Sequence, residues 1–165
     1  MAESPRVLIA LCTYNERENV ELLIPLLRRA VPDADLLFVD DNSPDGTGEL
    51  ADQMASQNSR IHVLHRKGKL GLGTAIIAGM NYAIENNFDF YTSMDADFSH
   101  NPKYLPAMVA GMAENDIMIG SRYVPGGGTE NWPFSRKFIS KSVNALVRFL
   151  FWISVKDASG GFRCY

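Results

Sequence analysis

The sequence contains only two cysteines in 165 residues, which is too few for the disulfide framework of a small secreted domain. Cys12 and Cys164 lie in apolar contexts without metal-ligand spacing, so the sequence favours a reduced, intracellular protein. Residues 1–5 lack a basic start followed by a long apolar region, so no secretory signal peptide is expected. No apolar run reaches about 18 residues, so no membrane-spanning segment is expected. A net charge of −3 argues against nucleic-acid binding, which usually needs a concentrated basic face.

The common glycine-rich phosphate-binding motifs are also absent. Residues 71–73, Gly-Leu-Gly, lack the third glycine of the dinucleotide-binding motif and follow the third expected strand instead of the first. Residues 67–69 do not complete a P-loop. The histidines form no recognisable catalytic arrangement. Without a phosphate-binding loop, a metal ion held by carboxylates becomes the expected neutraliser of a bound diphosphate.

The overall composition is typical of one globular domain, with 46% hydrophobic and 21% charged residues. Short apolar runs alternate with segments of helical periodicity, although Pro25 could kink or split the first helix. The expected strands are 7–11, 36–39, 61–64, 90–94 and 117–119, and the expected helices are 20–30, 47–56, 74–86 and 104–113. This alternation predicts an α/β fold with a mostly parallel central sheet and helices on both faces. The abrupt end at residues 162–165 leads us to expect that 1–165 is a catalytic domain truncated at its C-terminus.

Two later segments differ from this alternation. Residues 122–134 contain three consecutive glycines, and a long glycine-rich loop in a compact domain is more often functional than idle. We expect this loop to open and close over a ligand. Residues 137–155 form a long expected helix with broad apolar faces. It is either a core helix or an interfacial helix, since basic residues lie beside its large apolar side chains.

The most informative stretch is residues 94–97, Met-Asp-Ala-Asp, which closes an apolar strand. Strand side chains alternate between faces, so Asp95 and Asp97 are predicted to point the same way and to share one target. Paired hard oxygen ligands suit Mg²⁺ or Mn²⁺, and such ions usually bind together with a diphosphate. The alternative is that Asp-x-Asp is a turn or helix-cap signal ahead of Pro102.

Four polar segments follow four successive expected strands, at residues 12–16, 40–47, 69–75 and 95–99. The carboxyl ends of parallel strands meet at one edge of a sheet, and ligands of open α/β sheets bind in the crevice there. We therefore expect the four segments to converge on one binding site.

Together these motifs resemble the family 2 glycosyltransferases of the GT-A fold, and most closely their dolichol- and polyprenol-phosphate mannose synthase branch. Thr-Tyr-Asn-Glu at 13–16 and Asp-Ala-Asp at 95–97 are general to the family. Ser-Pro-Asp-Gly-Thr at 43–47 and Gly-Ser-Arg-Tyr at 120–123 indicate the polyprenol-phosphate branch more narrowly. Cys12 replaces the family's usual proline, where only backbone contacts are expected. The resemblance implies a GT-A nucleotide-diphospho-sugar transferase fold.

The resemblance also implies a role for individual residues. The guanosine of GDP-mannose would be held by Cys12, Tyr14, Glu16, Val39 and Asp41. The sugar and diphosphate would be held by Asp95, Ala96 and Asp97, with Asp97 the principal ligand of Mg²⁺ or Mn²⁺ and with Ser99 and Asp95 beside it. The phosphate of the acceptor would be held by Arg122 and Arg136, and Arg122 would also contact the donor. In other interpretations, Asp41 caps the following helix, and the two arginines are surface residues.

The implied reaction is a metal-dependent, inverting transfer of mannose from GDP-mannose to a polyprenyl (dolichyl-type) phosphate. The protein would act at a membrane surface, as a peripheral protein of the cytoplasmic face. A lipid monophosphate is mostly dianionic at neutral pH and is already a nucleophile, so the site needs arginines to orient it more than it needs a general base. Two alternatives remain: another donor such as UDP-glucose on the same fold, or a donor-binding fragment without turnover.

Overall fold

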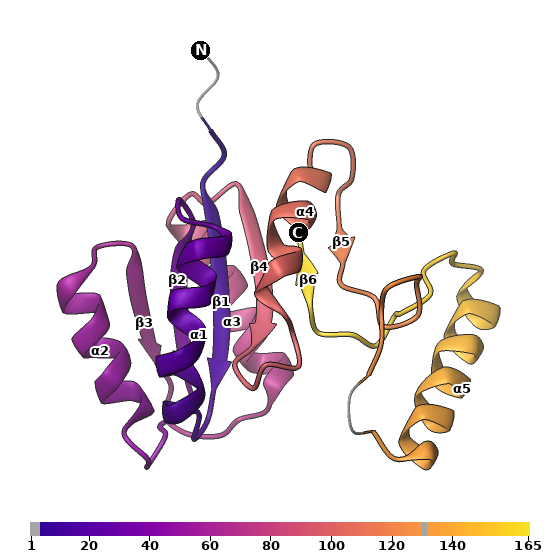
Figure 1. The fold of residues 1–165 in the computed structure, drawn as a ribbon, viewed down its shortest axis with the longest axis horizontal. Coiled ribbons are helices and arrows are strands. Elements are labelled where there is room, and N and C mark those ends of the chain that lie inside the picture. Colours follow the sequence, from indigo (N-terminus) through magenta and orange to yellow (C-terminus); the bar gives the residue numbers. More distant parts are fainter. Residues whose placement is uncertain (1–3, 130–131) are drawn as a thin grey trace.

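The computed structural model describes residues 4–129 and 132–165, and in this part of the chain it contains one six-stranded sheet in the order β3-β2-β1-β4-β6-β5 (Figure 1). The strands are β1 (Val7–Thr13), β2 (Asp35–Asp40), β3 (Ile61–His65), β4 (Phe90–Asp95), β5 (Met118–Ile119) and β6 (Arg163–Cys164). The helices are α1 (Arg17–Ala30), α2 (Thr47–Gln57), α3 (Leu72–Glu85), α4 (Leu105–Gly111), α5 (Phe134–Phe151) and the short 3-10 turn η1 (Pro102–Tyr104).

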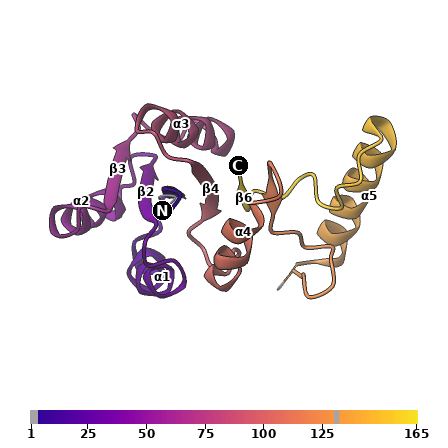
Figure 2. The same cartoon turned by 90° about the horizontal axis from the view of Figure 1, so that it is seen from above.

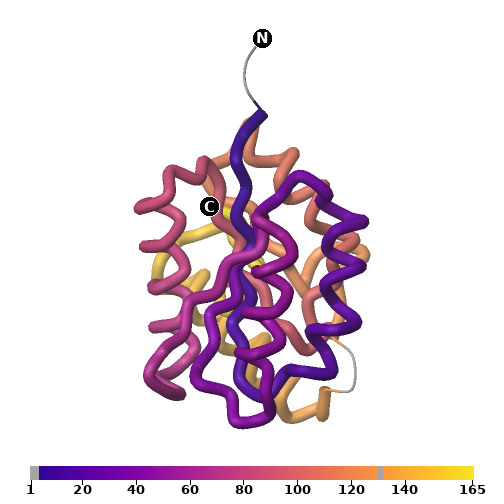
Figure 3. The backbone as a smooth tube through the Cα atoms, turned by 90° about the vertical axis from the view of Figure 1, so that its left-hand side faces the viewer, coloured from indigo at the N-terminus to yellow at the C-terminus, as the bar shows by residue number. Residues whose placement is uncertain are grey.

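Strands β1 to β4 are mutually parallel; β1, β2 and β4 are buried along most of their length, whereas β3 is the partly exposed edge strand. Strand β1 pairs with β2 on one side and with β4 on the other, and Leu8 to Leu11 are fully buried. Such nearly continuous apolar strands are typical of a parallel sheet covered on both faces. Figure 3 shows the side view, with the N-terminus at the top and the turns that follow β1 and β2 at the bottom.

Helices cover both faces of the sheet, as the alternation of apolar side chains requires (Figure 2). Ile9, Leu11 and Phe38 pack in one core cluster with apolar residues of α1, α2 and α4. Leu8 and Leu37 point to the opposite face of the sheet and pack in a second cluster with residues of α3. The predicted α/β fold with helices on both faces is therefore confirmed.

Helix α1 runs without interruption through Pro25, so this proline does not split it. Pro25 lies on the exposed face, where water can hydrate the carbonyl group that loses its hydrogen-bond donor.

The edge of the sheet beyond β4 differs from the prediction. The segment predicted as a buried parallel strand, residues 117–119, is reduced to the two-residue strand β5. It does not pair with β4, because β6 lies between them and is antiparallel to both. Strand β6 comes from the last residues of the chain, and its two residues are too few to produce a recognisable pattern.

Helix α5 begins at Phe134 and ends at Phe151, where Trp152 adopts a left-handed conformation. It stands beside the body of the molecule in Figures 1 and 2. Asn144 is its buried residue, whereas large apolar side chains on several sides are exposed. The exposed apolar residues of α5 and its end are Phe134, Phe138, Ile139, Val143, Leu146, Phe149, Leu150, Phe151 and Trp152. In the described structure, α5 is therefore not a core helix. The glycine-rich loop that precedes it is described except for residues 130 and 131, which lie outside the described residues.

Candidate active site

A pocket of about 270 Å³ opens at the carboxyl ends of β1, β2 and β4 and at the start of α3. All eight of the residues predicted for the donor other than Arg122 line it. They are Cys12, Tyr14, Glu16, Val39, Asp41, Asp95, Ala96 and Asp97. The pocket is also lined by Thr13, Lys69, Gly71, Leu72 and Ala75. The four polar segments that follow β1 to β4 thus converge on one site.

Buried and partly buried hydrogen bonds hold the first two of these segments together. The buried carboxylate of Asp40 accepts from the hydroxyl of Thr13 at 3.1 Å and from the amide of Ser43 at 3.1 Å. The amide of Glu16 donates to the hydroxyl of Thr47 at 3.0 Å. This network fixes the backbone that carries Tyr14 and Glu16, so the pocket wall is formed before any ligand binds.

Asp41 forms an ion pair with Arg66, whose Nη1 lies 2.7 Å from Asp41 Oδ1. Both side chains are only 9% exposed. The N-cap of α2 is instead Gly46, and the residue before it, Asp45, accepts from the amide of Thr47 at 3.0 Å through its Oδ1. The helix-cap interpretation of Asp41 is therefore wrong. Arg66 was not predicted, although its position just after β3, at the same edge of the sheet, could have indicated it.

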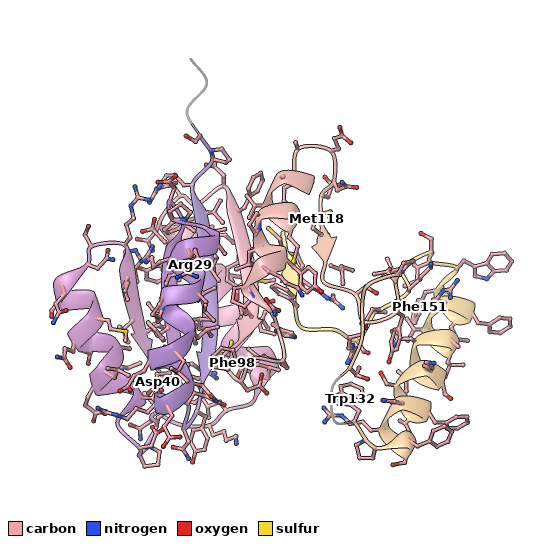
Figure 4. All side chains as sticks on the ribbon, in the orientation of Figure 1. Arg29, Asp40, Phe98, Met118, Trp132 and Phe151 are labelled. Atoms are coloured by element: carbon pink, nitrogen blue, oxygen red, sulfur yellow. The ribbon has the colours of Figure 1, made fainter. Side chains whose placement is uncertain are left out.

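The two aspartates of the acidic motif both reach the pocket, but for a reason other than the one predicted. Strand β4 ends at Asp95, so strand alternation does not extend to Asp97. A turn places Asp97 instead, in which its Oδ1 accepts from the amide of Ser99 at 3.0 Å and Phe98 adopts a left-handed φ of 63°. Figure 4 labels Phe98 beside the end of β4 and Asp40 at the end of β2.

The two carboxylates differ in their acidity. Burial raises the pKa of Asp95, an effect that His100 opposes and that the neighbouring Asp97 reinforces. Burial also tends to raise the pKa of Asp97, but hydrogen bonds from the side chain and backbone of Ser99 outweigh it and lower the pKa. Asp97 is therefore the more readily ionised of the two, as the principal ligand of a cation should be.

His100 holds the acidic turn in place and was missed from the sequence. Its Nδ1 accepts from the amide of Asp95 at 2.9 Å, and its ring stacks on Phe162 with a centroid separation of 4.9 Å. Burial lowers the pKa of His100, against the effect of Asp95 and Asp97. The residue is thus a neutral support for the turn. Only the approach of β6, which places Phe162 there, reveals this role.

Lys69 is a second residue that the sequence did not single out. Its Nζ lies 4.3 Å from the centre of the Tyr14 ring, within the distance for a cation–π interaction. It brings a positive charge to a pocket whose other charged lining residues are acidic. The start of α3, at Gly71 and Leu72, also lines the pocket, and the N-terminus of a helix favours a bound anion.

The pocket suits a divalent ion that arrives with its ligand. No group of three or more His, Cys, Asp or Glu side chains within residues 4–129 and 132–165 could enclose a metal ion. Asp95 and Asp97 provide two hard oxygen ligands, and the exposed Ser99 lies beside them. Mg²⁺ commonly binds through one or two carboxylates together with waters and substrate phosphates. The residues present therefore fit a metal ion shared with a diphosphate.

Arg122 lies apart from the pocket and contacts the fully buried Asp157. Its Nη2 donates to Asp157 Oδ1 at 2.6 Å, and its Nε donates to Oδ2 at 2.8 Å. The amide of Arg122 donates to Oδ2 as well, at 3.0 Å. Hydrogen bonding to Asp157 raises the pKa of Arg122. Much of the guanidinium fork that was predicted to bind the acceptor is thus occupied by a carboxylate.

Arg136 lines a separate pocket of about 360 Å³ at the start of α5. The other residues of this second pocket are Trp132, Ser135, Ile139 and Ser140. Arg136 thus lines the second pocket and eight of the predicted donor residues line the first, whereas Arg122 lines neither.

Comparisons with known proteins agree with this geometry. A family model described as "Glycosyl transferase family 2" matches residues 8–165. The undecaprenyl-phosphate mannosyltransferase of Micrococcus luteus is 46% identical over 160 residues, which is 97% of this chain and 66% of that protein. The polyprenol monophosphomannose synthase of Mycolicibacterium smegmatis is 44% identical over 162 residues, which is 97% of this chain and 61% of that protein. The chain thus spans about two thirds of the length of these relatives or slightly less.

One solved structure also covers nearly the whole chain. It is the glucosyl-3-phosphoglycerate synthase of Mycobacterium tuberculosis in complex with Mn²⁺, UDP and phosphoglyceric acid. The TM-score is 0.64 and the sequence identity is 16%, over 98% of this chain and 55% of that one. At this identity the likeness concerns the fold, and it agrees with the expected GT-A architecture.

Proposed function

This chain belongs to glycosyl transferase family 2, and on that premise we propose that it transfers mannose from GDP-mannose to a polyprenyl phosphate with the help of Mg²⁺ or Mn²⁺. The observation that carries the proposal is the convergence of all eight donor residues, Arg122 excepted, on the pocket of about 270 Å³. The names of the two curated relatives support mannose as the sugar and a polyprenyl phosphate as the acceptor.

The two ends of the donor pocket suit the two ends of a nucleotide sugar. Tyr14 offers an aromatic face, and Asp41 offers a carboxylate held by Arg66, so this end suits the nucleoside. Asp95 and Asp97 lie at the other side, at the end of β4, where they suit the sugar and the metal-bound diphosphate. Mg²⁺ or Mn²⁺ held there by Asp97, with Asp95 and Ser99 beside it, would act as a Lewis acid that stabilises the departing diphosphate.

The acceptor is proposed to bind at the second pocket, where Arg136 lies. A lipid monophosphate is mostly dianionic at neutral pH and can attack the sugar carbon directly, without a general base. Direct attack from the side opposite the leaving group inverts the configuration of the sugar. Arg136 would hold the attacking phosphate against its repulsion from the donor diphosphate. Arg122 is proposed to assist through its Nη1, because Asp157 and Ser159 accept from its Nε and Nη2.

We further propose that α5 lies on a membrane surface. Within the described residues, no helix combines the length and the hydropathy that crossing a membrane would need. Helix α5 nevertheless exposes large apolar side chains next to the basic residues Arg136, Lys137, Lys141 and Arg148. Apolar residues combined with positive charge are typical of helices that lie in the interface of an anionic bilayer. An acceptor phosphate at the start of α5 would then be close to its lipid phase.

Calorimetric titration tests the donor site. We expect GDP and GDP-mannose to bind with Mn²⁺ and to bind much more weakly without it, and UDP-glucose to bind weakly. Asp97→Asn should abolish the dependence on Mn²⁺, whereas Asp116→Asn, which removes an exposed aspartate outside the pocket, should not. Preference for UDP-glucose would replace the proposed donor with the alternative one. Unchanged Mn²⁺ dependence in Asp97→Asn would refute the metal assignment.

Radiolabelled transfer separates an enzyme from a donor-binding fragment. The chain covers 61–66% of the length of its curated relatives, so the assay should compare the 165-residue chain with a longer one built on the pattern of those relatives. Transfer of mannose to farnesyl phosphate by either chain supports the proposal. If both chains bind the donor and neither transfers mannose, the protein is a donor-binding module and not a transferase.

A further inference from the structure

Trp132, in the loop before α5, lies against both of the arginines assigned to the acceptor. The guanidinium carbon of Arg136 is 4.0 Å from the centre of the Trp132 ring, and that of Arg122 is 5.1 Å from it. Both distances fall within the range of about 6 Å in which a guanidinium is attracted to the face of an indole. One aromatic side chain thus brings together two cations from different parts of the chain, the turn after β5 and the first turn of α5.

Two guanidinium groups repel each other, so each needs a stabilising partner to lie beside the same indole ring. The partner of Arg122 is Asp157, which accepts from its Nε and Nη2 and neutralises its charge. Arg136 is exposed, and within residues 4–129 and 132–165 the interactions of its guanidinium group are with Trp132. The indole is therefore the group that sets the position of Arg136 relative to Arg122.

The surroundings of Trp132 suit the binding of a phosphate. Trp132 forms the wall of the second pocket with Arg136, Ser135, Ile139 and Ser140, so it contributes a rigid apolar surface beside hydroxyl groups and a positive charge. The hydroxyl of Tyr123 donates to Ser140 Oγ at 2.6 Å, which ties the segment after Arg122 to α5. The planar fork of Arg136 suits phosphate oxygens. Asp157 and Ser159 occupy Nε and Nη2 of Arg122, so Nη1 is the nitrogen of Arg122 left to bind the same anion among the described hydrogen bonds.

We propose that Trp132 is a positioning residue, whose indole holds Arg136 next to Arg122 so that the two guanidinium groups bind one lipid monophosphate. The proposal rests on the proposed function, in that it takes the acceptor to be a polyprenyl phosphate. It adds a residue that touches neither the donor nor the reacting atoms but determines whether the arginine pair, Arg122 and Arg136, is assembled.

The simpler alternative is that Trp132 only fills space beside α5. The two roles differ in what can replace the indole. A positioning role needs an aromatic face, so Trp132→Phe should preserve most of the function and Trp132→Leu should not. A space-filling role needs apolar volume, which leucine also provides.

The protein contains two tryptophans, so a single substitution isolates the signal of Trp132. Trp152 is 94% exposed and lies at the far end of α5, and Trp152→Phe leaves Trp132 as the one indole. In this variant we expect farnesyl phosphate to change the fluorescence of Trp132 and farnesol to leave it unchanged. Inorganic phosphate should act only at much higher concentration, which separates a lipid phosphate from a free anion. Arg136→Ala in the same background should alter the emission before any ligand is added and should remove the response.

Affinity for farnesyl phosphate, measured by calorimetry on the same chain, provides the second readout. We expect Trp132→Leu to weaken it roughly five- to thirtyfold, the range that corresponds to a cation–π contact partly removed from water. Trp132→Phe should stay within about threefold of the parent, because phenylalanine keeps a π face. Affinity for GDP with Mn²⁺ should be equal in all variants, which also shows that they are folded.

The outcomes separate the two proposals. If the parent chain binds farnesyl phosphate and Trp132→Leu binds it equally well, the positioning role is wrong and the proposed acceptor stands. Equal losses in the leucine and phenylalanine variants would likewise overturn the positioning role in favour of packing. If the parent chain binds GDP but not farnesyl phosphate, the proposed acceptor fails, and the role of Trp132 fails with it.

Discussion

Replacing Asp157 by asparagine should destabilise the C-terminal part of the protein strongly. Asp157 is fully buried, and its carboxylate accepts three hydrogen bonds from Arg122 at 3.0, 2.8 and 2.6 Å. Asparagine has nearly the same shape, but only one of its two terminal atoms is an oxygen that can accept a hydrogen bond. The other is an NH₂ group, a donor that would face the N–H donors of Arg122. The substitution therefore removes at least one charged hydrogen bond and leaves the positive charge of Arg122 without its counter-charge.

The magnitude follows from these contacts. A hydrogen bond to a charged group contributes about 1.5–3 kcal/mol, and removing one partner of a buried ion pair costs about 3–5 kcal/mol. The Arg122 side chain is 22% exposed, so water offsets part of the loss. We expect Asp157→Asn to lower the free energy of unfolding by about 3 kcal/mol. This is a large fraction of the 5–15 kcal/mol that is typical of a domain.

Urea unfolding measures the loss, and exchange of the Arg122 amide, which donates to Asp157, reports it locally. The matched control is Asp33→Asn, which removes the carboxylate of an exposed ion pair with Arg60 at 3.4 Å. Exposed pairs contribute little, so the control should match the parent within error. In a double-mutant cycle with Arg122→Met, the combined loss should be clearly smaller than the sum of the single losses.

The pH dependence has a defined sign. Burial tends to raise the pKa of Asp157, but the hydrogen bonds and charge of Arg122 lower it. A carboxylate with a lowered pKa stabilises the fold above its unfolded pKa of about 3.9, and this contribution is lost as the pH falls through the folded pKa. The difference between the parent and Asp157→Asn should therefore be constant from about pH 5 to 7 and shrink below about pH 4. A loss under 1 kcal/mol at pH 7, or additive effects in the cycle, would refute the reasoning.

Three further predictions concern the donor pocket and the core. Asp41→Ala should weaken GDP and GDP-mannose alike by about 1–3 kcal/mol, as calorimetry would detect, and normal binding would remove Asp41 from the nucleoside site. Burial, reinforced by Asp95 and Asp41, raises the pKa of Cys12 to about 12. Iodoacetamide at pH 8 should therefore label this thiol on the order of a thousandfold more slowly than an ordinary cysteine, and fast labelling in mass spectrometry would contradict the prediction. Gly79→Ala should destabilise the fold by roughly 1–3 kcal/mol in urea, because a Cβ there would lie 2.7 Å from the hydroxyl oxygen of Tyr91. Gly73→Ala in the same helix, with no atom within 4 Å of the added Cβ, should not, and equal effects would refute the packing argument.

Local pattern was sufficient to predict much of the protein. The four long strands and the helices α1 to α4 follow from apolar periodicity, and their predicted bounds differ from the observed ones by a few residues. The donor pocket followed from the same alternation, because parallel strands must place the segments at their carboxyl ends along one edge. Predictions of this kind succeed since they depend on neighbours along the chain and on one rule of sheet geometry.

What the sequence could not supply is the pairing of side chains that are distant along the chain. Arg66 meets Asp41, and His100 meets Phe162, only where separate strands and turns converge. Strand β6 was missed because two residues carry no periodicity, although its position between β4 and β5 determines the order of that edge.

The arginines show the division most clearly. The sequence by itself determined the donor side, where Asp95 at the end of β4 and Asp97 in the turn that follows both line the pocket. Only the tertiary structure decided that Arg122 pairs with Asp157, 35 residues later, and that Arg136 rests on Trp132. A charged side chain takes whichever partner the folded chain brings within a few ångströms, because electrostatic attraction and hydrogen bonding depend on distance in space, which separation along the sequence does not determine.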